Sequence, residues 1–162
     1  MTLEEVQNVT LERPDEKPPS GFGVTLIVEP HEQSTQALLD RLREAWSVVA
    51  GWGRWSDEDL GDWPEAEDAL TALPEWLRTR LREEPAYELQ NWMDDLHDRE
   101  WIWWSGAVVG DRVKLDVKAM ALPASLWPLE SLVSWAGGEV LDRLQPWVPS
   151  DEVRLYGRTG GR

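Results

Sequence analysis

The sequence predicts an α+β fold of the split βαβ (ferredoxin-like) kind, in which helices cover one face of an antiparallel four-stranded sheet. The first observation is that segments with strand and helix patterns follow one another in the order β-α-β-β-α-β. The second is a Gly110-Asp111 pair between two alternating runs, which is typical of a tight hairpin. The third is a long acidic segment with helical periodicity, which we interpret as an insertion between the first helix and the central hairpin. A looser α+β sandwich is the alternative.

Each element of this order has its own local pattern. The first strand is rich in β-branched residues and ends at Pro30, and the helix after it has apolar residues at helical spacing before Gly51. Ser125 is the expected N-cap of the last helix, and Gly137 with Gly138 its expected stop. The predicted elements are, in chain order, a strand at 23–29, a helix at 33–50, strands at 101–109 and 112–120, a helix at 126–136, and weaker strands at 139–144 and 152–156.

The chain divides into one domain with two polar ends. We expect residues 1–20, which carry several prolines, to form a flexible N-terminal arm. Residues 21–156 are expected to form a single α+β domain, and residues 157–162, with their glycines and arginines, a disordered tail.

The acidic helical insertion spans residues 56–100. It carries 15 acidic residues against 4 arginines, so most of the net charge of −15 is concentrated in it. Short helices are expected to begin near Pro64, Pro74 and Pro85, because proline favours the first turn of a helix. The last of these helices has an apolar stripe at the i, i+3, i+4 and i+7 positions, formed by Leu89, Trp92, Met93 and Leu96.

Tryptophan supplies almost all of the aromatic content, with 12 Trp against 1 Phe and 2 Tyr. If Val109 pairs with Arg112 across the hairpin turn, strict alternation places Trp104 on the apolar face of the hairpin. Trp101 and Trp103 then lie on the opposite face, among charged residues. We expect the inserted helices to fold back over that face. The side chains expected to pack on the two indoles are Trp76, Trp92 and Leu96.

Composition excludes several function classes. The net charge of −15 argues against nucleic-acid partners and anionic membrane surfaces, since both need a basic footprint. The absence of cysteine excludes disulfides and thiolate chemistry. No signal peptide, membrane-spanning run, phosphate loop, dinucleotide fingerprint or nucleophile elbow is present, so we expect a cytoplasmic protein without a cofactor. His31 is interpreted as an exposed loop side chain.

The leading functional hypothesis is a non-enzymatic protein-binding module. Its acidic, tryptophan-bearing insertion would recognise a partner with a basic surface, because acidic patches steer basic partners and tryptophans supply interface anchors. Small acidic inhibitors of toxic nucleases, of the immunity-protein type, have the same physical character, although no motif here matches such a family. The residues expected to contact the partner are Asp57, Asp59, Asp62, Trp63, Glu65, Asp94 and Asp95.

The alternative hypothesis is a small metal-dependent or small-molecule enzyme. Asp94, His97 and Asp98 project from one side of a helix, a spacing that can offer oxygen and nitrogen ligands to a metal ion. Di-iron bundles need such a carboxylate-x-x-His pair twice, and this chain has it once. A solvated helix end is therefore the simpler interpretation of the cluster.

Overall fold

The computed structural model describes residues 3–13, 16–54 and 63–147. Its elements follow the predicted order, with one additional helix before the first strand and three within the insertion. They are α1 (Leu3–Asn8), β1 (Phe22–Pro30), α2 (Thr35–Trp52), α3 (Ala66–Ala72), α4 (Glu75–Arg82), α5 (Ala86–Asp98), β2 (Trp101–Val109), β3 (Arg112–Ala119), α6 (Trp127–Trp135) and β4 (Gly138–Trp147). The strand predicted at 152–156 lies outside the described residues.

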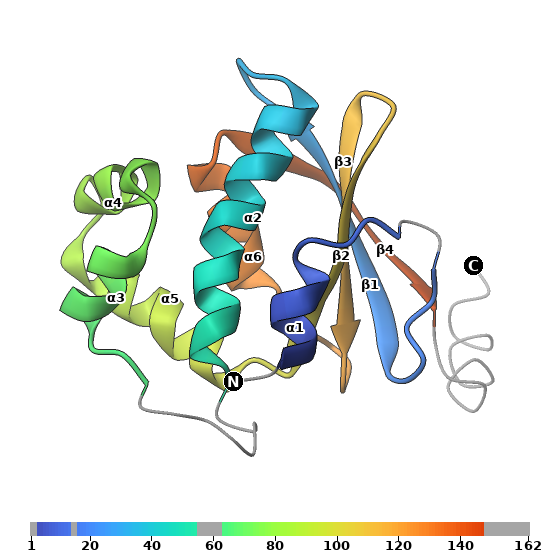
Figure 1. The fold of residues 1–162 in the computed structure, drawn as a ribbon, viewed down its shortest axis with the longest axis horizontal. Coiled ribbons are helices and arrows are strands. Elements are labelled where there is room, and N and C mark those ends of the chain that lie inside the picture. Colours follow the sequence, from blue (N-terminus) through green and yellow to red (C-terminus); the bar gives the residue numbers. More distant parts are fainter. Residues whose placement is uncertain (1–2, 14–15, 55–62, 148–162) are drawn as a thin grey trace.

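The strands form one sheet in the order β2-β3-β1-β4, with every neighbouring pair antiparallel. The prediction of an α+β fold is thus confirmed. Helices α1, α2 and α6 lie on one face of the sheet, and α3, α4 and α5 lie beyond them (Figure 1). The core between sheet and helices takes Leu26 and Val28 from β1 and Leu115 and Val117 from β3, all fully buried.

Local signals explain where the helices begin and which face they bury. Ser34 caps α2, its Oγ accepting a hydrogen bond from the backbone N–H of Ala37 at 3.0 Å. The side chains of α2 at the predicted helical spacing are buried against the sheet. In the insertion, α4 and α5 begin directly after Pro74 and Pro85, as expected.

The hairpin register differs from strict alternation. Val109 pairs with Arg112 as predicted, but a bulge interrupts the ladder between Trp103 and Ser105. Trp103, not Trp104, is therefore opposite Val117, because the bulge adds one residue to β2. The predicted faces of the three hairpin tryptophans are consequently wrong.

The tryptophans of β2 accordingly belong to the helix-covered core. Trp101 and Trp103 are 1% and 0% exposed, and Trp46 of α2 stacks on Trp101 with ring centroids 5.4 Å apart. Trp103 lies 6.1 Å from the same Trp46 ring. Trp104, at the bulge, is covered by the guanidinium of Arg13, which lies 3.3 Å from its ring centroid.

The insertion packs on the helical layer, and the prediction that it covers the opposite face of the sheet is wrong. Trp92 of α5 meets Trp135 of α6 edge-on at 5.5 Å, and its indole N–H donates to the carbonyl of Pro128 at 2.9 Å. Arg41 of α2 lies over the Trp76 ring of α4 at 5.7 Å. The reason is that the hairpin indoles already face α2, so the apolar stripe of α5 finds its partners on the helices.

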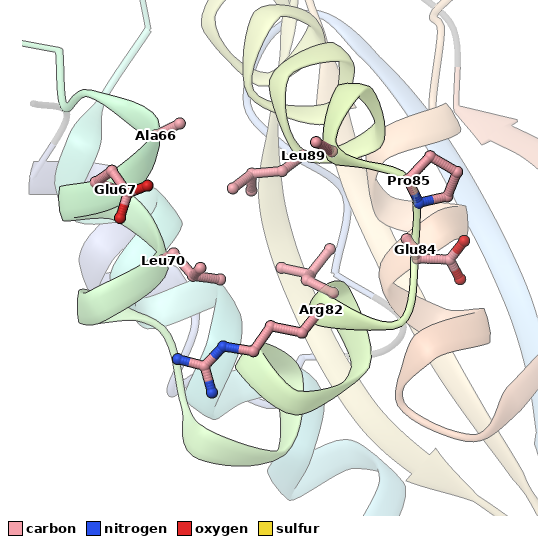
Figure 2. Close-up of a pocket in the computed structure, with 9 residues that line it drawn as sticks. Ala66, Glu67, Leu70, Arg82, Glu84, Pro85 and Leu89 are labelled. Carbon is pink, nitrogen blue, oxygen red and sulfur yellow. The ribbon is translucent and has the colours of Figure 1, made fainter.

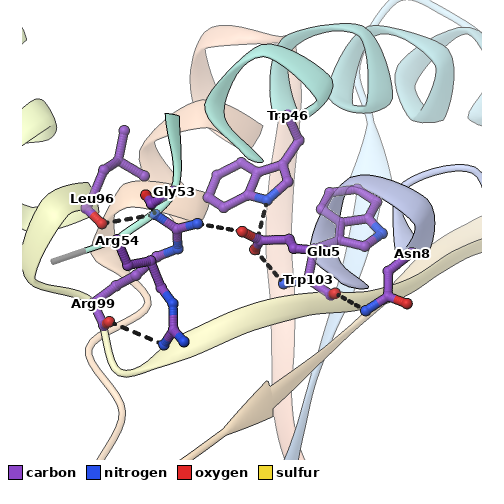
Figure 3. A network of polar contacts seen from close by, with 8 residues as sticks. All are labelled: Glu5, Asn8, Trp46, Gly53, Arg54, Leu96, Arg99 and Trp103. Carbon is purple, nitrogen blue, oxygen red and sulfur yellow. Dashed lines mark hydrogen bonds and ion pairs between the residues drawn. The ribbon is translucent and has the colours of Figure 1, made fainter. Parts of the chain in front are cut away.

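The N-terminal segment assigned to a flexible arm contains α1, which binds the edge strand β2. The backbone N–H of Trp103 donates to Glu5 at 2.7 Å, and the carbonyl of Trp103 accepts from Asn8 at 2.8 Å (Figure 3). Arg13 donates to the carbonyl of Trp104 at 3.1 Å. These contacts satisfy backbone groups that an edge strand otherwise exposes.

Glu5 is also the centre of a buried polar network. Its carboxylate pairs with Arg99, whose side chain is 0% exposed, and accepts from the Trp46 indole at 3.2 Å (Figure 3). Arg99 further donates to the carbonyl of Leu96 at 2.7 Å and to that of Gly53 at 3.3 Å. The network thereby ties α1 to the end of α5 and to the end of α2.

Candidate functional site

Helix α5 presents an acidic face to solvent. Its apolar stripe is buried on the core side, with Trp92 and Leu96 at 0% exposure. Because side chains three and four residues apart share a face, burying that stripe turns Asp94, Asp95 and Asp98 outward, and all three are exposed. We call these three residues and the exposed Glu100 that follows the helix the acidic surface.

Two adjoining pockets are lined by the acidic surface. One, of about 230 Å³, includes Asp95, Asp98 and Glu100 and is closed on its other side by the loop at 121–125. The other, of about 340 Å³, is formed by Asn91, Asp94, Asp95 and Trp127. Asp95 lines both, so the two pockets adjoin at this side chain, and we call them together the acidic groove, which lies between α5 and the start of α6.

The groove is built on an ordered base. The Trp101 indole N–H donates to the carbonyl of Ser125 at 2.7 Å, which fixes the loop to β2. Arg99 also lines the smaller pocket. Its guanidinium, however, is buried and paired with Glu5. The cation nearest to the groove is thus already bound by a carboxylate of the core.

The charge of the acidic surface is only weakly compensated. Among the ion pairs of residues 3–13, 16–54 and 63–147, none includes Asp94, Asp95 or Glu100. Partial burial raises the pKa of the Asp95 carboxyl above its usual value of 3.8, and the charges of Asp94 and Asp98 raise it further. A cation placed in the groove would relieve this repulsion.

The structure brings together some of the residues predicted to contact a partner. Asp94 and Asp95 line the groove, and Trp63, in the segment before α3, packs against α5 with its ring 4.9 Å from that of His97 and 5.8 Å from that of Trp52. Glu65 is exposed at the start of α3. The remaining predicted contact residues, Asp57, Asp59 and Asp62, lie outside the described residues.

Of the predicted metal ligands, His97 and Asp98 contact each other, whereas Asp94 has a different partner. Asp94 accepts a hydrogen bond from Gln90 at 2.8 Å, and His97 Nδ1 lies 2.9 Å from Asp98 Oδ1. In the described part of the chain, the group of His and carboxylate ligand atoms that lies within 4.8 Å is formed by other residues. A metal ion at these three positions stays a prediction.

A separate pocket of about 310 Å³ lies among α3, α4 and α5 (Figure 2). Its lining is mainly apolar and includes Leu70 of α3, Leu81 of α4 and Leu89 of α5. Glu67 and Arg82 stand at its rim in Figure 2. The volume is at the lower end of what small-molecule pockets occupy. Glu84 also lines this pocket, so it combines mainly apolar walls with three charged side chains.

Two parts of the groove were not predicted from the sequence. Trp127, 37% exposed, and the loop 121–125 are distant in sequence from the insertion. A tryptophan directly before Pro128 at a helix start is the local signal that was available, but it does not reveal which surface the indole joins.

Comparison with known proteins gives neither a family nor a function for this chain. No family model, curated protein or solved structure matches this chain. Within the described residues, no helix combines the length and the apolar character needed to span a bilayer. The functional argument therefore rests on the groove itself.

Proposed function

We propose that this protein is a non-enzymatic binding module whose acidic groove on α5 recognises a protein with a basic surface. The observation that carries the proposal is the convergence of Asp94, Asp95, Asp98 and Glu100 on two pockets that share Asp95. In character such a module resembles an acidic inhibitor of a basic enzyme. The cytoplasmic location and the absence of nucleic-acid partners stay predictions of the sequence.

Electrostatics supports a cationic occupant. Partial burial, and then the charges of Asp94 and Asp98, raise the pKa of Asp95, and an arginine or lysine side chain in the groove would offset the repulsion among these carboxylates. Arginine fits especially well, since its planar guanidinium can bind two carboxylates at once. Complementary charge also accelerates encounter with a basic partner.

An exposed indole beside the carboxylates supports a protein partner. Trp127 stands in the pocket with Asp94 and Asp95. Tryptophan is enriched among the residues that dominate interface energies, and its face attracts cationic side chains. A basic segment that places one cation among the carboxylates and stacks another on Trp127 would use both features.

We also propose that the fold is the split βαβ arrangement with a helical insertion. Read from the other edge, the strand order is β4-β1-β3-β2, and the antiparallel pairs make β1 and β2 parallel with β3 between them. In this arrangement α2 and α6 are the two crossover helices. The insertion then follows α2 without disturbing the sheet.

The proposal is tested by selecting binders from a library of random peptides on the immobilised full chain. We expect the retained peptides to be rich in arginine and lysine and to lose affinity as salt is added. Replacing Asp94, Asp95 and Asp98 together by asparagine should weaken binding about tenfold, if each contact contributes roughly 0.5 kcal/mol.

The control has the same change of charge elsewhere. Asp40, Glu44 and Asp68 are exposed outside the groove, and their triple amide variant should bind the selected peptides as the unmodified chain does. Equal loss of binding in both triple variants would show that only net charge matters. Selection of acidic or apolar peptides would contradict the proposal outright.

A further inference from the structure

A histidine and two glutamates meet at the edge of the sheet, far from the acidic groove in sequence. Glu29 of β1 and Glu139 of β4 are directly paired in the antiparallel ladder. His31 Nε2 lies 3.2 Å from Glu139 Oε2. One ligand atom from each of the three side chains lies within 4.8 Å of the others.

The pairing of the two glutamates is unfavourable without a cation. Residues directly opposite each other in an antiparallel pair have neighbouring side chains, and like charges in that position destabilise the sheet. Arg112 offers partial compensation, with its Nη1 3.8 Å from Glu29. The same Nη1 lies closer to Asp111, at 3.0 Å, so Arg112 keeps a partner if Glu29 binds something else.

The backbone around His31 is held in place from both sides. The His31 N–H donates to the carbonyl of Gly137 at 2.8 Å, and Gln33 Nε2 donates to that carbonyl at 3.0 Å and to that of Ala136 at 2.8 Å. Between them Glu32 adopts a φ of 55°, which a non-glycine residue rarely does. The turn is thus clamped to the start of β4, and only side-chain rotations are needed to bring the three ligand atoms closer.

We propose that Glu29, His31 and Glu139 bind one divalent cation of the zinc class. One imidazole nitrogen and two carboxylate oxygens form a mixed N/O set that suits Zn²⁺, which is commonly held by three protein ligands and a water. Bonds of about 2.0–2.2 Å place such ligands roughly 3–3.6 Å apart, so rotations of the glutamates that bring the ligand atoms about 1–2 Å closer complete the site. The two carboxylates neutralise the ion. This site is independent of the proposed protein-binding function.

The test is a calorimetric titration of the full chain with ZnCl₂. We expect one ion per chain, and a loss of affinity of about tenfold or more in both H31A and E139Q, since even indirect supports of a metal site commonly contribute that much. Both side chains are more than half exposed, at 53% and 57%, so neither variant should lose its fold. The melting temperature should rise with zinc in the unmodified chain and in neither variant.

The matched control is H97A, which removes the other histidine of the chain. We expect H97A to bind zinc as the unmodified chain does. No binding by the unmodified chain, or equal binding by H31A, would overturn the proposal. Loss of binding in H97A alone would place the ion at α5 and overturn it as well. Binding of Ca²⁺ in preference to Zn²⁺ would refute the assigned class of metal.

Discussion

Replacing Glu5 by glutamine should be among the most destabilising single changes that preserve side-chain volume. Glu5 is fully buried, and its carboxylate serves three donors from three elements: the guanidinium of Arg99, the indole of Trp46 and the backbone N–H of Trp103. Glutamine keeps one acceptor oxygen but replaces the other carboxylate oxygen with an NH₂ group, which cannot accept a hydrogen bond from any of the three donors. The Arg99 guanidinium then loses its buried ion pair with Glu5.

The expected magnitude follows from the loss of that buried ion pair. Breaking a buried ion pair from one side costs about 3–5 kcal/mol, against a total stability of roughly 5–15 kcal/mol for a typical domain. At about 2–4 °C per kcal/mol for a chain of this size, the melting temperature should fall by roughly 6–20 °C. Urea unfolding followed by circular dichroism measures the loss directly.

A neighbouring residue provides the control. Glu4 is exposed and pairs with Lys118 at 3.3 Å, so Glu4→Gln changes the same charge on the same helix. Lys118 is largely buried but the Glu4 side chain is 43% exposed, so water screens the pair from one side and its loss should cost about 1 kcal/mol. If Glu5→Gln costs no more than Glu4→Gln, the buried network does not hold α1 on the sheet, and the reasoning fails.

Two further predictions test packing and the charge of the groove. A Cβ at Gly106 would lie 2.7 Å from the Trp103 ring and 3.0 Å from Leu39, whereas one at Gly51 in α2 meets nothing within 4 Å. Gly106→Ala should therefore lower the free energy of unfolding by about 1–3 kcal/mol, and Gly51→Ala should raise it by up to about 1 kcal/mol. Urea unfolding measures both changes, and equal effects of the two substitutions would contradict the described packing. Because the pKa of Asp95 is raised in the folded state, its ionisation opposes folding as pH rises past its usual value of 3.8. Asp95→Asn should accordingly be more stable than the unmodified chain near pH 7, with no difference below about pH 3. Thermal unfolding across that pH range measures both, and a difference in stability that persisted in acid would disprove the raised pKa of Asp95.

Local patterns predicted the elements well where one residue decides the geometry. Gly110, with its φ of 62°, and Asp111 fix the hairpin turn, and Pro74 and Pro85 precede α4 and α5 as expected. The periodicity of α5 correctly identified its buried stripe. Each of these features depends on residues within one or two turns of the chain.

Features that depend on distant contacts were not predictable in this way. The run Trp103-Trp104 is apolar in either register, so nothing local shows that Trp104 is the bulge residue. In the sequence, Glu5 is one polar residue of a segment interpreted as an exposed arm, because its partner Arg99 lies 94 positions away. The acidic charge of α5 was foreseen, but the groove depends on Trp127, which tertiary packing brings to it.

The central claim is that the groove beside α5 is where a basic partner binds. The most direct measurement is the indole N–H resonance of Trp127, assigned with Trp127→Phe, during titration with a basic peptide selected on the full chain. The account predicts a saturating shift of that resonance, together with shifts of the backbone amides of residues 94–100. Shifts confined to the pocket among α3, α4 and α5, with the Trp127 resonance unmoved, would contradict it.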